Sequence, residues 1–245
     1  MYIKSTNSTN TLLKELIVHG NPPEFIYAGY QTAGRGQTGN GWESEADKNL
    51  LCSILLPPRK NLFELNVLVS VAVQRLLGED FTIKWPNDIY WKDKKLAGIL
   101  IENAIVGGEL KYAIAGIGLN VNQTEFRSDA PNPISLRQIT GQEQDIDKLM
   151  QRLYDEVQKA TEEDVWNYYR AHLYRREGYW PYVEREVSTE PTMNAEQRMA
   201  NGEWRKVNGE FLARIEDVLQ TGELVLRDED GKERIYHFKQ VRYVI

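Results

Sequence analysis

The sequence predicts an α+β protein in which a mixed-sheet domain with helices packed on it, residues 1–183, is followed by a small β-barrel domain, residues 184–245. Apolar strand-like runs and helical periods occur together in the first part, which is large enough to bury a sizeable core. The chain then turns polar between Tyr182 and Phe211. It ends in short alternating segments divided by glycine turns, a pattern typical of a barrel of about five strands.

The first elements along the chain are a helix, two strands and a second helix. A leucine and isoleucine stripe predicts a helix over 11–20 that ends at a glycine, and a strand opened by two prolines follows over 22–30. The nearly continuous apolar run 49–58 predicts a strand buried on both faces. The run 63–78 predicts a mostly buried helix with a glycine just past its end.

The middle of the chain adds strands and then a helical pair. Residues 81–86 and 88–102 predict strands around a charged turn, and 108–122 predicts another strand after a Gly-Gly turn. Helical periodicity over 146–173 predicts a pair of helices that closes the first domain. The polar segment 188–210 is interpreted as a loop or insertion with no assigned role.

Composition narrows the class of protein. A formal net charge of −6 with no Lys/Arg block argues against a sequence-independent grip on nucleic acid. Cys52 is the only cysteine, which excludes an intramolecular disulfide and a cysteine-based zinc site. No signal peptide opens the sequence and no apolar run approaches the ~20 residues of a membrane span. We therefore expect a reduced, cytoplasmic, soluble protein that does not bind membranes.

A glycine-rich stretch over 31–42, QTAGRGQTGNGW, contains the G-x-G-x-x-G pattern of a dinucleotide-binding turn. That turn must open a helix, but only WESEADK separates it from the next strand, so the match is spurious. A phosphate-binding Walker loop also fails, because no Lys-Ser/Thr follows the last glycine. Two interpretations stay open: a loop whose backbone N–H groups and Arg35 bind another anion, or a structural turn without a ligand.

Four further motifs favour a ligand. STNSTN, residues 5–10, precedes the first helix, and KWPND, residues 84–88, ends a strand. KKLAGI, residues 94–99, carries a lysine into an apolar strand whose Gly98 lets a ligand lie against the backbone. GIGLNVN, residues 116–122, repeats that device.

Together with the glycine-rich stretch, these motifs in this order and spacing resemble the biotin protein ligases, the biotin–[acetyl-CoA-carboxylase] ligases. The resemblance covers most of residues 5–136. It implies a class II synthetase-like catalytic domain followed by an SH3-like barrel. Only seven residues precede Ser8, so the resemblance is to the monofunctional kind without an N-terminal DNA-binding domain.

The resemblance also implies a reaction. Family members use ATP and Mg²⁺ to convert biotin into biotinyl-5′-AMP, and then pass biotin to a lysine of a biotin carboxyl carrier protein or domain. A homodimer is compatible with the resemblance. A lipoate–protein ligase, or a biotin-binding protein without catalysis, is the alternative.

The resemblance assigns one group of residues to biotin. The residues implied to bind the ureido ring of biotin are Ser8, Thr9 and Asn10, together with Gln31. An N-cap role for one of the first three stays open. The remaining positions of this group lie in the glycine-rich stretch and in KKLAGI: Arg35, Gly36, Gln37, Lys95 and Gly98.

A second group is assigned to the nucleotide and to catalysis. Asn87 and Asn120 are implied nucleotide contacts with Gly34 and Arg35, and Trp42 packs near the adenine or only anchors its loop. Lys95 and Arg35 supply positive charge in the reaction, and Asp88 orients a metal, a loop or the acceptor amine. The metal ligands are not assigned.

No covalent nucleophile is needed, because biotin's own carboxylate attacks the α-phosphorus of ATP and the protein contributes alignment and positive charge. His19, His172 and His237 lie outside every motif, so a Ser-His-Asp hydrolase has no support.

The sequence departs from the family pattern in the glycine-rich stretch, where Gln37 and Asn40 replace arginines that many members carry. Exchanging a charged for a neutral hydrogen bond weakens the grip on the adenylate by ~1–2 kcal/mol, roughly five- to thirtyfold. We therefore expect this chain to release more of the intermediate.

Overall fold

The computed structural model describes residues 1–37, 41–128, 132–185 and 210–245. They form two compact units, Met1–Tyr174 and Arg175–Ile245. The division comes ahead of the predicted boundary after residue 183, because the strand Trp180–Glu184 pairs within the second unit. Nearly all of the polar segment 188–210, together with Gly39 and Asn40, lies outside the described residues.

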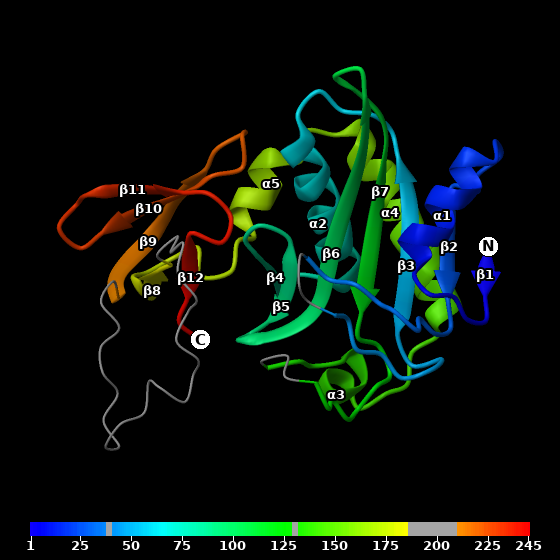
Figure 1. Cartoon of the computed structure of the whole chain (residues 1–245). Helices are drawn as coiled ribbons and strands as arrows, with labels where there is room; N and C mark the ends of the chain where they lie inside the picture. Colours follow the sequence, from blue (N-terminus) through cyan, green and yellow to red (C-terminus); the bar gives the residue numbers. More distant parts are fainter. Residues whose placement is uncertain (38–40, 129–131, 186–209) are drawn as a thin grey trace. The chain divides into compact units, whose positions relative to one another are not determined.

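The first unit is built on a seven-stranded sheet in the order β1-β2-β3-β7-β6-β5-β4 (Figure 1). β1 runs parallel to β2, and the other neighbouring strands are antiparallel, so the sheet is mixed as the sequence predicts. Its strands in chain order are β1 (Tyr2–Ile3), β2 (Phe25–Ala28), β3 (Leu50–Leu56), β4 (Phe81–Lys84), β5 (Asp88–Trp91), β6 (Lys94–Val106) and β7 (Glu109–Leu119).

Five helices within the described part of the chain accompany this sheet. Figure 1 shows α2 and α4 together on one face and α1 on the other. They are α1 (Thr9–Val18), α2 (Leu62–Leu77), α3 (Leu136–Thr140), α4 (Ile146–Glu162) and α5 (Trp166–Ala171). The two predicted helices and the predicted pair are confirmed. The short elements β1 and α3 escape sequence patterns, since two and five residues carry too little periodicity to be recognised.

The core lies mainly between the sheet and the helix α2. Most of α2 is buried, including polar residues such as Ser70 and Gln74, because the helix packs on the sheet with one side and on α4 with the other. The Gln74 side-chain amide donates to the carbonyl oxygens of Gly78 and Phe81, which satisfies a buried polar group and fixes the end of the helix.

The opposite face of the sheet positions the functional residues. Leu13 of α1 packs there against Ile26 and Ile114. Successive residues of a strand point to opposite faces, so Gly116 and Gly118 share the face of Ile114. This face is therefore apolar under the middle of α1 and bare of side chains toward the end of β7.

The second unit holds a five-stranded antiparallel sheet in the order β11-β10-β9-β8-β12. Its strands are β8 (Trp180–Glu184), β9 (Glu210–Val218), β10 (Leu224–Asp228), β11 (Glu233–Tyr236) and β12 (Val241–Tyr243). Tyr182, Ile215 and Leu226 form part of its buried core. In both units, no helix among the described residues has the length and apolar character to cross a membrane.

Candidate active site

Three glycines form the floor of the candidate site. Gly98 on β6 and Gly118 on β7 are direct neighbours in the sheet, and Gly116 lies two residues before Gly118 in β7. A Cβ on Gly116 would lie 2.5 Å from the Asn10 side-chain oxygen, and one on Gly118 would lie 2.4 Å from the Trp42 ring. Only glycine lets these two side chains lie directly on the backbone.

The first turn of α1 brings the residues predicted to bind the ureido ring to one end of this floor. Ser8, Thr9 and Asn10 are all buried. The backbone N–H and the hydroxyl of Thr9 both donate to Gln31 Oε1, at 2.7 and 3.0 Å. Ser8 occupies the N-cap position, but its side chain makes no capping bond. The structure therefore brings Gln31 beside this turn, as the resemblance implies, and the N-cap alternative is not supported for Ser8.

Two residues that sequence reasoning missed join this cluster. Ser53 is fully buried, and its hydroxyl lies 2.7 Å from Thr9 Oγ1 and 2.6 Å from Asn10 Oδ1. Glu102 Oε2 accepts a 2.6 Å hydrogen bond from Asn10 Nδ2. The signals for both were present: a serine inside the apolar run LLCSILL, and a carboxylate in the apolar strand after KLAGI.

Arg35 lies at the same end as these residues. Its Nη2 donates to Thr11 Oγ1 at 3.1 Å and lies 3.5 Å from Glu102 Oε1, with half of the side chain exposed. Its loop is closed by a hydrogen bond from the Trp42 N–H to the Gly34 carbonyl, at 3.0 Å. A Cβ on Gly34 would lie 2.8 Å from the Trp42 carbonyl oxygen, so this closure also requires glycine. Gly36 follows in the same loop.

Lys95 and Trp42 define the other end. The Lys95 ammonium forms a 2.8 Å ion pair with Asp88 and lies 5.8 Å from the centre of the Trp42 ring. Its Cε and Nζ would both be 3.4 Å from a Cβ on Gly98. The backbone of Lys95 is held by Asn132 and Ile134, which fixes the start of β6.

Arg35 and Lys95 are therefore separated along the sheet rather than paired. From Gly98, beside Lys95, to Glu102, beside Arg35, the strand advances four residues, or ~13 Å at the usual rise per residue. One cation therefore lies at each end of a strip of the sheet surface whose floor is formed by the three glycines. The implied action of both cations on one phosphate stays a prediction.

The Trp42 indole covers the glycine floor at the Lys95 end of the strip. It lies over Gly98 and Gly118, and its buried Nε1 has no hydrogen-bond partner among the described residues. A buried donor without a partner is costly, and an acceptor atom of a ligand would relieve that cost. Whether Trp42 contacts an adenine stays a prediction.

The predicted nucleotide contacts Asn87 and Asn120 are buried and bind the protein itself. Asn87 donates to Asn66 Oδ1 at 2.6 Å and accepts from Gln37 Nε2 at 3.1 Å. Asn120 donates to the Ile134 carbonyl at 3.0 Å. Gln37 thus links the glycine-rich stretch to the turn of KWPND.

The segment after Trp42 is anchored by Glu43, whose carboxylate accepts from the backbone N–H groups of Arg127 and Ser128, each at 2.8 Å. Partial burial opposes ionisation of Glu43, but the hydrogen bonds from Ser128 and Arg127 outweigh it and lower its pKa. Trp42 is therefore followed by a fixed, charged anchor.

The histidines and the cysteine do not contribute to this site. His19 and His172 make local helix contacts and His237 faces Glu223, so none joins this site. Cys52 is buried, and burial raises its pKa, which makes the thiol unreactive. Within the described residues, no group of three or more His, Cys, Asp or Glu side chains is arranged to hold a metal ion.

Comparison with known proteins agrees with the motifs. Residues 2–120 match the model of the Biotin/lipoate A/B protein ligase family. The chain belongs to this family, and the sequence-based resemblance is confirmed.

Individual relatives refine the assignment. The bifunctional ligase/repressor BirA of Bacillus subtilis is 29% identical over 250 residues, covering 96% of this chain and 71% of the relative. The biotin–[acetyl-CoA-carboxylase] ligase of Mycobacterium tuberculosis is 29% identical over 169 residues, covering 64% of this chain and 61% of the relative. The biotin protein ligase of Aquifex aeolicus, solved with biotin and ATP, has the same fold, with a TM-score of 0.72 at 23% identity over 100% of this chain and 98% of that one.

The glycine floor leads to a first prediction. Gly118→Ala places a methyl group 2.4 Å from the Trp42 ring, so the indole must retreat by about 1 Å to reach normal carbon–carbon contact. A crystal structure of the variant measures this shift. Gly41→Ala is the control, since its Cβ meets nothing closer than 3.8 Å. An indole that stays in place in the Gly118→Ala variant would contradict the close contact.

The Glu43 anchor leads to a second prediction. Since the folded pKa is lowered, ionised Glu43 stabilises the fold above its unfolded pKa, and that stability is lost as the pH falls through the folded pKa, below 4.5. Glu43→Gln should therefore lower the melting temperature at pH 7, and the deficit should shrink toward pH 3. Melting curves across this range measure it, and a deficit that does not change with pH counts against the anchor.

Proposed function

We propose that this protein is a biotin protein ligase: it activates biotin with ATP to biotinyl-5′-AMP and transfers biotin to a lysine of a biotin carboxyl carrier domain of a carboxylase. One observation carries the proposal. One strip of the sheet brings together Ser8–Asn10, proposed to bind the ureido ring, the glycine floor and the Lys95–Asp88 pair, in a chain of this family. The substrates are those held by the solved Aquifex aeolicus ligase.

In the first step, a carboxylate oxygen of biotin attacks the α-phosphorus of ATP. A phosphorus–oxygen bond forms, the bond to the β-phosphate bridge breaks, and pyrophosphate leaves. Alignment of the two substrates contributes most of the acceleration, and a fixed cation stabilises the negative charge that grows on phosphorus oxygens. We assign the stabilisation of this negative charge to Lys95. The ion pair with Asp88 and the backbone hydrogen bonds at the start of β6 hold its side chain over the glycine floor.

In the second step, the amine of the acceptor lysine attacks the acyl carbon of the adenylate, an amide forms and AMP leaves. The amine must first lose a proton, since the usual pKa of lysine is ~10.4. We assign Asp88 as the carboxylate that accepts this proton, and its ion pair with Lys95 holds it in place. Arg35, at the other end of the strip, is proposed to close the loop over biotin.

Mg²⁺ is proposed to arrive with ATP, because this ion is usually held by substrate phosphates with only one or two carboxylates. We derive no step through it. The first unit is proposed to be the class II synthetase-like catalytic domain, and the five-stranded second unit an SH3-like barrel. Action in the cytoplasm and a homodimer stay predictions.

One experiment separates the ligase from its alternatives. Adenylation is reversible, so labelled pyrophosphate enters ATP only in the presence of the correct acid. Biotin-dependent exchange supports the proposal, and lipoate-dependent exchange indicates a lipoate ligase. No exchange with either acid, together with biotin binding, indicates a binder without catalysis.

Lys95→Ala tests the assigned charge. Loss of a fixed cation at the reacting phosphate should slow biotin-dependent exchange by about 10²-fold or more, the usual cost of removing one such group. Lys94→Ala is the matched control, because Lys94 is the exposed neighbour on the same strand. Full exchange activity in the Lys95 variant would overturn the mechanism.

Gln37→Arg tests the departure from the family pattern. A charged donor in place of the amide should slow release of biotinyl-5′-AMP by about five- to thirtyfold. A stopped-flow chase of preformed adenylate measures the off-rate. An unchanged or faster rate would show that Gln37, through Asn87, already holds the loop as well as an arginine can.

A further inference from the structure

Glu102 is the residue that connects the two binding elements at one end of the strip. Its two carboxylate oxygens contact different segments of the chain. Oε2 accepts from the Asn10 amide on α1 at 2.6 Å, and Oε1 lies 3.5 Å from the Arg35 guanidinium in the glycine-rich stretch. Asn10 and Arg35 are 92 and 67 residues away in the sequence. One carboxylate on the rigid strand β6 thus reaches both.

Glu102 also determines how the neighbouring polar groups can be arranged. An ionised carboxylate only accepts hydrogen bonds, so it requires the Asn10 amide to turn its Nδ2 toward β6 and its Oδ1 toward Ser53. The Ser53 hydroxyl has one proton and two possible acceptors, Asn10 Oδ1 at 2.6 Å and Thr9 Oγ1 at 2.7 Å, so the orientation of the Asn10 amide decides whether Asn10 can accept it. Thr9 in turn lies within hydrogen-bond distance of Gln31.

The direction of these hydrogen bonds matters for recognition. A cyclic urea presents N–H donors and one carbonyl acceptor in fixed places, and a site that offers the wrong partner leaves a buried group unpaired. A neutral side chain at position 102 would let the Asn10 amide turn over. The donor and acceptor positions offered by Asn10 and Ser53 would then no longer be unique.

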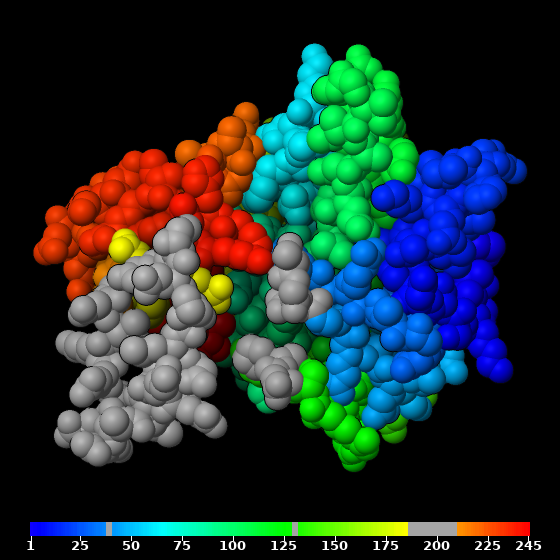
Figure 2. Space-filling view, in the orientation of Figure 1, coloured from blue at the N-terminus to red at the C-terminus, as the bar shows by residue number. Residues whose placement is uncertain are grey.

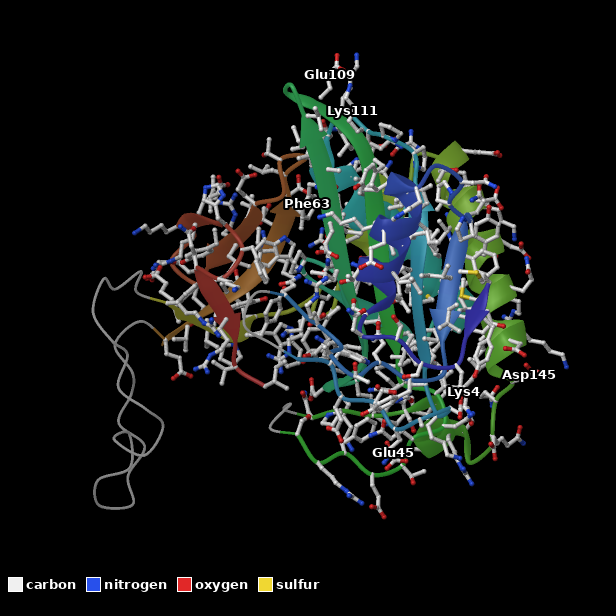
Figure 3. The ribbon with its side chains drawn as sticks, turned by 45° about the vertical axis from the view of Figure 1, so that its right-hand side comes forward. Lys4, Glu45, Phe63, Glu109, Lys111 and Asp145 are labelled. Carbon is white, nitrogen blue, oxygen red and sulfur yellow. The ribbon has the colours of Figure 1, made fainter. Side chains whose placement is uncertain are left out.

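A plain surface ion pair on the same hairpin provides the contrast. Glu109 lies 2.8 Å from Lys111, two residues away, and its side chain is 77% exposed. Figure 3 shows both side chains together at the tip of the hairpin between β6 and β7, which stands at the surface in Figure 2. Such a pair contributes little to stability and orders nothing else. Glu102 differs because its shortest contact is to Asn10, which is only 3% exposed.

We propose that Glu102 is a positioning residue of the biotin site. It fixes the amide orientation of Asn10, and through Asn10 the direction in which the Ser53 hydroxyl donates, while it holds Arg35 beside them. It acts through these residues and does not touch the reacting atoms. The naming of biotin as the substrate rests on the function proposed above, whereas the positioning of Asn10 and Arg35 does not.

Two variants and one control test this proposal. Glu102→Gln removes the charge and permits the Asn10 amide to turn over. Glu102→Asp keeps the charge but draws the carboxylate back by one methylene, so it should not restore both contacts. Glu109→Gln removes a carboxylate of the same hairpin that pairs with the exposed Lys111.

The first readout is the kinetics of biotin-dependent pyrophosphate exchange. Both Glu102 variants should raise the KM for biotin about tenfold with little change in kcat, the pattern expected when a binding interaction of one charge-assisted hydrogen bond is lost. A role limited to stability would lower the active fraction, and hence kcat, without raising KM. An unchanged KM in Glu102→Gln, or a wild-type KM in Glu102→Asp, would overturn the proposal.

The second readout needs no substrate. Amide hydrogen exchange over residues 34–37 and the first turn of α1 should speed up in both Glu102 variants and not in Glu109→Gln. Exchange equal to wild type at both places would also overturn the proposal. Wild-type protein inactive with biotin would defeat the proposed function, and this readout would still decide whether Glu102 positions Asn10 and Arg35.

Discussion

The site depends on a steric constraint: three positions on one face of β6 and β7 carry no side chain. Gly116 and Gly118 let Asn10 and Trp42 lie against the backbone, and Gly98 lets Trp42 and Lys95 share the same floor. A methyl group at any of these positions would occupy the space of a neighbouring atom. The glycine-rich stretch and the first turn of α1 can therefore meet over the sheet only because the sheet is bare there.

The net charge of the chain does not reveal the two positive charges along this floor. The chain carries a formal charge of −6, yet a lysine and an arginine mark the two ends of the strip. Each has a carboxylate partner, Asp88 for Lys95 and Glu102 for Arg35. These acids hold the cations in place before substrate binds, and alignment is what a reaction without a covalent protein intermediate requires.

Much of this protein was predictable because its signals are local. The run LLCSILL becomes the interior strand β3, and the periodic segment that begins near Phe63 becomes the buried helix α2. Ordered motifs indicated the family, and the comparisons confirm it. The short strand β1, by contrast, exists because a partner elsewhere in the chain completes it, such as Tyr27. The short helix α3 is capped within its own segment, by Ser135 with Gln138 and by Gly141, but its five residues show no clear period.

The sequence by itself determined most of the strands, the main helices, the family and the residues that belong to its motifs, because periodicity, turn chemistry and motif spacing are local properties of short stretches. Only the tertiary structure decided which of these residues meet. It separated Arg35 from Lys95, placed Trp42 on the glycines and brought in Ser53 and Glu102. The physical reason is that the register of β3, β6 and β7 sets these contacts, and no local pattern in one strand encodes its register with another.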